Sequence, residues 1–265
     1  MSTPSTAAPP AIAVRIEGLR VDFERAGESL RALDGLDLEV REREFLAIVG
    51  PSGCGKSTLL NVLAGTLRPT AGTVLVDGAP VVGINRSLGY VTQDDNLLPW
   101  RTLLGNIELP LELRGRPSAE RRRRALELIR RVELERFESH YPYELSGGMR
   151  QRANIIRALI YDPTLIVMDE PFGSLDAFTR GKMQKLVLDL WESARKTVMF
   201  ITHDLAEAIV LADRIVVMSR RPGHVKAIVD VPIARPRDTF GVKTTDEFQR
   251  SFNEVWELLA EEVID

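Results

Sequence analysis

Residues 45–58, FLAIVGPSGCGKST, decide the fold of this chain. The continuous apolar run at 45–49 is typical of a strand buried on both faces of a sheet. Residues 50–58 fit the pattern G-x-x-x-x-G-K-[ST], and residues 56–64, KSTLLNVLA, have a helical composition. Strand, glycine-rich loop and helix in this order indicate a phosphate-binding loop. An ordinary glycine turn before a helix would explain the complete motif much less well.

This loop would supply the contacts that a nucleotide needs. Its glycines let backbone N–H groups converge on phosphate oxygens, and the following helix N-terminus adds its dipole. We expect Lys56 to contact the β- and γ-phosphates and the Ser57 hydroxyl to ligate Mg²⁺. The predicted ATP-binding residues of the loop are Gly50, Pro51, Ser52, Gly53, Cys54, Gly55, Lys56, Ser57 and Thr58.

The chain on either side of this loop alternates between strand and helix patterns. Residues 12–49 have the alternation and turn composition of β-structure. After residue 142, helix patterns alternate with apolar strand runs, which indicates parallel βαβ units and an α/β fold. The expected elements there are helices at 149–160, 178–196 and 205–213 and strands at 164–170, 197–203 and 214–219.

Residues 101–142 differ from the segments on either side, because they contain helical patterns and few strand patterns. We interpret them as a mostly helical insertion. Its four consecutive arginines, Arg121–Arg124, stand among glutamates, which favours a solvated helix face over nucleic-acid or lipid contact. Residues 245–263 predict an amphipathic helix whose apolar face carries Phe248, Phe252, Val255, Leu258 and Leu259.

The run LIVMDE at 165–170 ends in two acidic residues. Such a strand can place Asp169 at its C-terminal edge beside the phosphate loop, where it would help to hold Mg²⁺ through water. Glu170 would then lie near the γ-phosphate and could orient or deprotonate the attacking water. The alternative is a buried strand whose acids merely face solvent.

Residues 145–149 form a second glycine-rich segment before a helix. They are Leu145, Ser146, Gly147, Gly148 and Met149. A serine hydroxyl and exposed glycine amides at a helix N-terminus suit phosphate contact. A flexible loop with an N-cap is the alternative interpretation.

Composition excludes several classes of protein. The chain has 265 residues, and its 35 basic and 38 acidic side chains give a formal charge of −3, which disfavours a dedicated nucleic-acid binder. The one cysteine, Cys54, excludes an intrachain disulfide and a cysteine-based zinc site. No apolar run approaches the roughly 18 residues of a membrane span. The N-terminus lacks the features of a secretion signal, so we expect a soluble protein.

Together, and in this order, these motifs resemble the ATP-binding subunit of an ABC transporter over about residues 12–235. LSGGM is similar to the family's signature loop, with Met149 in place of the commoner glutamine. Gln93 matches the glutamine that senses Mg²⁺ and contacts the membrane partner, and His203 matches the switch histidine. The loop joining two ATP sites is matched by Ser174, Leu175 and Asp176. Phe23 is the candidate for stacking on adenine, although packing of its ring in the core is nearly as good an explanation.

The resemblance implies a P-loop NTPase core, with a RecA-like mixed sheet, an antiparallel β subdomain and a helical subdomain at about 96–160. Residues 1–11 are expected to be a disordered tail, and residues 236–265 a C-terminal helical extension. In the family, the signature loop of one subunit covers the ATP held by the other. The resemblance therefore implies a head-to-tail dimer with a second ATPase subunit, expected to be identical, and with ATP and Mg²⁺ as ligands.

The sequence is similar to those of the nitrate, sulfonate and taurine class of importers at residues 97–115, 171–180 and 220–223. For that class the partners are transmembrane permeases, docked near residues 97–115, and indirectly a periplasmic or lipid-anchored binding protein. The implied location is the cytoplasmic face of the inner membrane, with no nucleic acid as partner. Nitrate, sulfonate, taurine or a related small anion is the expected substrate.

Other nucleotide-binding proteins fit less well. A soluble ABC ATPase of DNA repair would carry long coiled coils between the phosphate loop and the signature, yet Lys56 and Ser146 are only 90 residues apart (146 − 56). Ribosomal types usually have two ATPase modules in one chain. A kinase or GTPase would leave LSGGM and His203 unexplained.

Overall fold

The computed structural model describes residues 11–25, 28–173 and 175–263. Most of the predicted N-terminal tail, residues 1–10, and Ser174 lie outside the described residues. The central element is a six-stranded sheet in the order β10-β9-β3-β8-β7-β6. Its strands are β3 (Phe45–Val49), β6 (Leu88–Val91), β7 (Leu165–Asp169), β8 (Thr197–Ile201), β9 (Arg214–Met218) and β10 (Val225–Asp230). All neighbours pair in parallel except β9 and β10.

Strand β3 is buried on both faces, as the apolar run predicts. Phe45, Ala47 and Val49 face one core, which is closed by α5 (Ala177–Ala194), α6 (Leu205–Leu211) and α7 (Asp246–Val263). Leu46 and Ile48 face a second core, which α1 (Lys56–Leu63) and an antiparallel sheet cover. Because alternate side chains of a strand point to opposite faces, β3 contributes to both hydrophobic cores.

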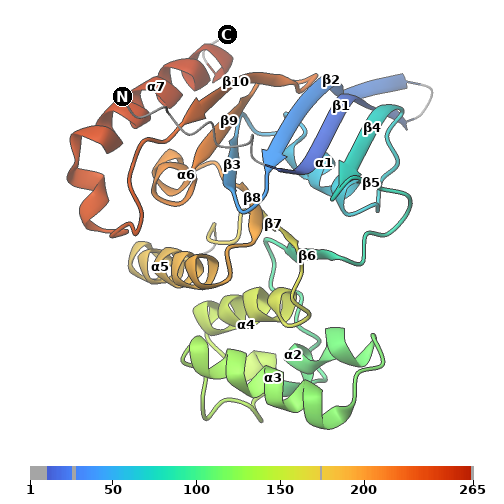
Figure 1. The fold of residues 1–265 in the computed structure, drawn as a ribbon, viewed down its shortest axis with the longest axis vertical. Helices are drawn as coiled ribbons and strands as arrows, with labels where there is room; N and C mark the ends of the chain where they lie inside the picture. The colour runs from blue at the N-terminus through green and yellow to red at the C-terminus, as the bar shows by residue number, and fades with distance from the viewer. Residues whose placement is uncertain (1–10, 26–27, 174, 264–265) are drawn as a thin grey trace, which may run out of the picture.

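The antiparallel sheet has the order β2-β1-β4-β5 and lies beside the central sheet (Figure 1). Its strands are β1 (Ile12–Arg25), β2 (Glu28–Arg41), β4 (Ala71–Val76) and β5 (Ala79–Pro80). In the register of β1 and β2, Phe23 stands opposite Leu30. Phe23 and Leu30 are 38% and 45% exposed, so they form an exposed apolar pair at the end of the sheet and are not part of the core.

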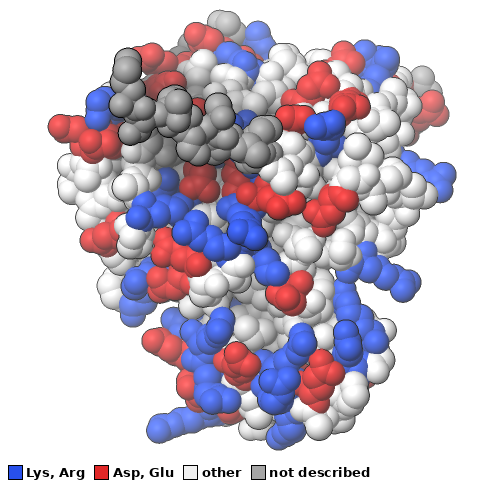
Figure 2. All heavy atoms as spheres, viewed as in Figure 1, with Lys and Arg blue, Asp and Glu red and all other residues white. Residues whose placement is uncertain are grey.

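The predicted helical insertion forms a lobe at the bottom of Figure 1. Its elements are α2 (Leu103–Glu112), α3 (Ser118–Arg131), η1 (Pro142–Glu144) and α4 (Gly147–Leu159), and they pack around a separate apolar cluster. On α3, Arg124 pairs with Glu120 at 3.3 Å, while Ala125 and Ile129 are buried. Figure 2 shows basic and acidic side chains interspersed over this lobe, which is the appearance of a solvated face.

The P-loop core, the antiparallel β subdomain and the helical insertion confirm the predicted α/β fold class. The C-terminal helix α7 also forms, with Phe248 and Val255 buried against the core. Three short strands, β5, β6 and β10, were not predicted, because two to six residues with glycine, proline or charged neighbours give little periodicity. A further short element, η2 (Gly241–Thr244), precedes α7.

Within residues 11–25, 28–173 and 175–263, none of the helices has the length and apolar character to cross a membrane.

Candidate active site

The phosphate loop holds its lysine at its centre. Lys56 Nζ donates hydrogen bonds to the carbonyl oxygens of Gly50 and Pro51, both at 2.8 Å, and the residue is 8% exposed. Gly55 precedes α1 with a φ of 105°, a conformation that favours glycine. The ammonium therefore stands at the N-terminus of a helix, where an anionic oxygen can replace the carbonyls as its partner.

A hollow opens above this loop, and the antiparallel sheet forms its other wall. We call it the phosphate-loop hollow. It is lined by Phe23, Leu30, Ala32, Ser52, Gly53, Gly55, Lys56, Ser57, Thr58, Glu170 and Arg221. The candidate for adenine stacking thus lies at the same hollow as the loop, with its ring partly exposed, which is a suitable place for a base.

Cys54 belongs to the loop but not to the wall of the hollow. Its side chain is 1% exposed and packs within the second core. Burial raises the pKa of the Cys54 thiol, although the nearby Lys56 ammonium opposes this. A protonated, buried thiol is a poor nucleophile, so the position fits a spacer.

The candidate catalytic carboxylate follows β7 and lies next to His203. Glu170 Oε2 lies 2.9 Å from His203 Nδ1, and the Glu170 N–H donates to the Ile201 carbonyl at 3.0 Å. Glu170 has a φ of 44°, in the left-handed region that non-glycine residues rarely adopt. Gln93 Nε2 also approaches this corner, since a Cβ built on Gly173 would be 3.9 Å from both Gln93 Nε2 and Glu170 Oε2. Glu170 and His203 are therefore in direct contact, and the Gln93 amide lies on the same side of Gly173 as the Glu170 carboxylate.

Asp169 and Ser57 form the candidate Mg²⁺ position. Burial raises the pKa of Asp169 and the adjacent Glu170 adds to this, whereas a hydrogen bond from Ser57 and the Lys56 charge lower it. A hydroxyl and a single carboxylate fit Mg²⁺, which usually takes one or two carboxylates together with phosphates and water. In the part of the chain that the structure describes, no cluster of three or more His, Cys, Asp or Glu residues forms a metal cage. The nucleotide would have to complete the coordination.

The signature loop lies at a different hollow. Ser146 caps α4 and its hydroxyl accepts the Met149 N–H at 3.3 Å. This signature hollow is lined by Glu133, Leu134, Phe137, Ser146, Gly147, Gly148, Met149, Arg152, Leu175, Asp176, Thr179 and Lys182. Asp176 caps α5 by accepting the N–H groups of Phe178 and Thr179, both at 3.0 Å. Two of the three residues predicted to join the ATP sites therefore border the signature loop.

Residues 220–223, RRPG, contribute to the phosphate-loop hollow, which their local sequence does not indicate. Arg221 lines that hollow. Gly223 packs directly on the loop at Cys54. The Gly223 N–H donates to the Ala32 carbonyl at 2.8 Å, and its carbonyl accepts from Asp34 N at 3.1 Å. The sequence RRPG indicates only a similarity to one class of importers. It does not predict this contact, because residues so far apart in sequence leave no local pattern.

Gly223→Ala is expected to weaken ATP binding. A Cβ at this position would overlap the Cys54 carbonyl oxygen, which is backbone and cannot rotate away. Either the 220–223 segment or the phosphate loop has to shift, so we expect about a tenfold loss of ATP affinity, equivalent to about 1.4 kcal/mol. Equilibrium nucleotide binding measures this. Gly105→Ala is the control for an added methyl group, since Gly105 lies on α2 outside the phosphate-loop hollow and its Cβ would meet only ordinary contacts of 3.4–3.9 Å. Wild-type affinity in Gly223→Ala would contradict the packing argument.

A phosphate loop after a strand buried on both faces, a second glycine-rich helix start in the helical lobe, and a glutamate–histidine pair beside the phosphate loop are the features of an ATP-hydrolysing protein. The ABC transporter family model matches residues 33–173, more than half of the chain. The chain therefore belongs to this family and is an ABC transporter ATPase, as the motifs predict.

Relatives match over most of their length. An uncharacterised ABC transporter ATP-binding protein, MJ0412 of Methanocaldococcus jannaschii, is 46% identical over 96% of this chain and 93% of its own. The taurine import ATP-binding protein TauB of Rhizobium johnstonii is 43% identical, covering 89% and 91% of the two chains. The aliphatic sulfonates import ATP-binding protein SsuB of Bacillus cereus is 38% identical with the same coverage.

Among solved structures, the dimeric post-hydrolysis state of the ATP-binding cassette MJ0796 bound to ADP and Pi is similar to this chain. The TM-score is 0.75 at 36% identity, and the match covers 83% of this chain and all of the other. The two chains therefore share one fold.

Proposed function

We propose that this chain hydrolyses ATP as one half of a head-to-tail dimer that encloses two nucleotides. The observation that carries the proposal is the separation of the two anion-binding loops. No residue of the described chain lines both the phosphate-loop hollow and the signature hollow. Each chain therefore offers two incomplete sites, and a second copy turned head to tail would complete both. The similar MJ0796 cassette is itself dimeric.

Within each site the roles follow from position. Lys56 and the loop amides bind the phosphates, and Phe23 stacks on the base. Glu170 accepts a proton from the attacking water, and His203 holds the carboxylate through the 2.9 Å contact. Ser57 and Asp169 would hold Mg²⁺, with Gln93 nearby, and the ion would neutralise charge on the phosphates.

We further propose that the dimer drives an importer of a small anion such as a sulfonate, taurine or nitrate. Support comes from relatives named for taurine and aliphatic sulfonate import, which this chain matches over about nine-tenths of its length. The partners would be two membrane permease subunits, with a substrate-binding protein acting on them from the other side. The ATPase would then sit peripherally on the cytoplasmic face of the inner membrane. A soluble role on DNA or ribosomes lacks comparable support.

Co-purification from detergent-solubilised membranes tests the transport assignment. We expect the full chain to bring down membrane-spanning permeases, and a substrate-binding protein when the complex is captured gently. Adding taurine or an alkanesulfonate with that binding protein should stimulate ATP hydrolysis by the reconstituted assembly several-fold, whereas a sugar should not. Recovery of ribosomal or repair proteins instead would contradict the importer.

A further inference from the structure

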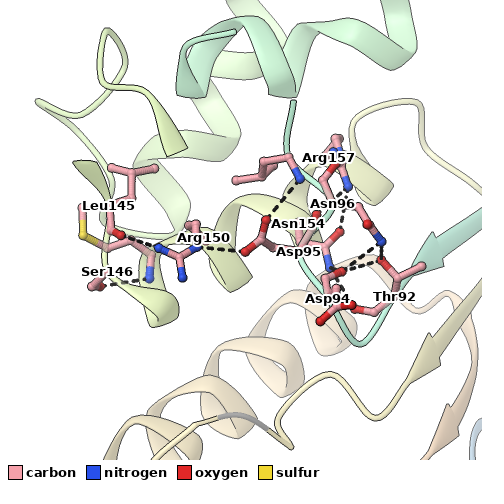
Figure 3. Close-up of polar contacts among 11 residues, drawn as sticks. Thr92, Asp94, Asp95, Asn96, Leu145, Ser146, Arg150, Asn154 and Arg157 are labelled. Atoms are coloured by element: carbon pink, nitrogen blue, oxygen red, sulfur yellow. Dashed lines mark hydrogen bonds and ion pairs between the residues drawn. The ribbon is translucent and has the colours of Figure 1, made fainter. Parts of the chain in front are cut away.

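Helix α4 carries a polar stripe that faces residues 92–96 (Figure 3). Arg150, Asn154 and Arg157 have the spacing i, i+4 and i+7, so they share one side of the helix. Asn154 Nδ2 donates to the Thr92 carbonyl at 3.0 Å, and Arg157 Nη1 donates to the Asn96 carbonyl at 2.7 Å. Residues 92–96, which we call the glutamine segment, are thus attached to the helix that the signature loop begins.

Arg150 is the member of this stripe that also touches the signature loop. Its Nε lies 2.9 Å from Asp95 Oδ2, and its Nη1 donates to the Leu145 carbonyl at 2.6 Å. Since the guanidinium is a rigid planar fork, these two contacts fix Leu145 and Asp95 relative to each other. Leu145 is the first residue of the signature loop, directly before Ser146.

Asp95 makes the matching connection on the other side. Its Oδ1 accepts the Leu97 N–H at 3.1 Å, and its backbone carbonyl accepts from Arg157 Nη2 at 2.8 Å. Asp95 stands two residues after Gln93 and two before the 97–115 segment, which the sequence associates with permease docking. The Asp95 carboxylate thus connects Arg150 with the start of the 97–115 segment, while its backbone carbonyl is bound by Arg157.

We propose that Arg150 and Asp95 are positioning residues that make the signature loop and the glutamine segment move as one unit. Closure of the signature loop over the partner's nucleotide would then displace residues 97–115. Conversely, a displacement of residues 97–115 would move the signature loop away from that nucleotide. This inference rests on the proposed head-to-tail dimer. It assigns the direct link between Leu145 and the glutamine segment to one ion pair, since Asn154 and Arg157 bind the segment from α4 without contacting Leu145.

The pair can be removed without unfolding the lobe. The side chains of Arg150 and Asp95 are 34% and 28% exposed, and ion pairs of this kind contribute little to stability. Asn154, which is fully buried, and Arg157 continue to hold the backbone of the glutamine segment. Truncation of Arg150 or Asp95 therefore tests coupling, whereas truncation of Asn154 would test folding.

The first measurement is MgATP-driven dimerisation of the full chain by analytical ultracentrifugation. It uses a Glu170→Gln background, in which hydrolysis does not dissolve the dimer. We expect Arg150→Ala and Asp95→Ala each to raise the dimer dissociation constant about tenfold. The double variant should be no weaker than the worse single, because both remove the same link. ATP affinity of the monomer should remain within about twofold, since neither residue lines the phosphate-loop hollow.

Asp94→Ala is the matched control. It removes a neighbouring carboxylate, while the contact of Asp94 with the stripe runs through its backbone carbonyl and Asn154 Nδ2 at 3.5 Å. Dimerisation of this variant should equal that of the background.

The second measurement reports the coupling itself. Uniform 5-fluorotryptophan labelling gives one ¹⁹F signal for each of the three tryptophans. Trp100, in the 97–115 segment, is 71% exposed, whereas Trp191 is buried in the core and Trp256 lies on α7. MgATP should shift the Trp100 signal in the Glu170→Gln dimer. In Arg150→Ala the shift should fall at least twofold at protein concentrations that restore the dimer. Trp256 serves as the internal reference, and Trp100→Phe assigns the signal.

Unchanged dimerisation in both single variants, additive losses in the double variant, or a full Trp100 shift in Arg150→Ala would each overturn the coupling role. If the Glu170→Gln background itself fails to dimerise with MgATP, the proposed function fails and this inference fails with it. The two failures are therefore distinguishable in one series.

Discussion

Glu170→Gln is expected to lower ATP turnover by roughly 10²–10⁴-fold, the usual contribution of a general base. The change keeps the shape of the side chain and removes its basicity. An amide can still hydrogen-bond to His203 Nδ1, which lies 2.9 Å from the carboxylate, so the switch histidine should keep its place. Lys56, Ser57 and Asp169 are unchanged, and MgATP should still bind.

The same variant should accumulate as a dimer, because hydrolysis no longer separates the two subunits. Size-exclusion chromatography with MgATP should show a dimer peak that the wild-type protein shows only weakly, and steady-state phosphate release gives the rate. His203→Ala is the informative companion, since it leaves the base but removes its partner, and it should lose turnover without losing nucleotide affinity. A Glu170→Gln protein that stays monomeric and hydrolyses at the wild-type rate would refute both the base and the dimer.

The parts of this site that lie in contiguous motifs could be predicted from sequence, because local spacing determines their geometry. FLAIV must be buried on both sides, so it must be a central strand, and the loop after it must then face the carboxyl edge of the sheet. The same edge receives Asp169 and Glu170 from β7 and His203 after β8, since parallel strands end at one side. These placements follow from topology once the strand order is known.

Contacts between distant segments could not be predicted in this way. Arg150 appears in the sequence as one more charged residue on a surface helix, and its partner Asp95 is 55 positions away. Gly223 and Cys54 are joined only because the turn before β10 folds back onto the phosphate loop. Neither pair produces periodicity, a cap or a spacing rule, so only three-dimensional packing identifies it.

Ser146→Arg is expected to abolish hydrolysis while each chain still binds ATP. Ser146 caps α4 at the signature hollow, which shares no described residue with the phosphate-loop hollow. A long guanidinium at this position would occupy the space that the partner's nucleotide needs in the head-to-tail dimer. Turnover should fall at least about 100-fold, and the affinity of the monomer for ATP should change less than about twofold.

Met149→Gln is the control, because the Met149 contribution to the loop is its backbone N–H, which donates to Ser146 Oγ and survives the change. It should keep turnover within about threefold. A mixing experiment then separates a dimer effect from local damage. Ser146→Arg chains keep an intact phosphate loop, and Lys56→Ala chains keep an intact signature loop, so a mixed dimer has one complete site although each variant alone has none. Turnover should therefore appear on mixing and should increase with the concentration of either partner. Normal hydrolysis by Ser146→Arg alone would show that one chain completes its own site, and the head-to-tail arrangement would be wrong for this protein.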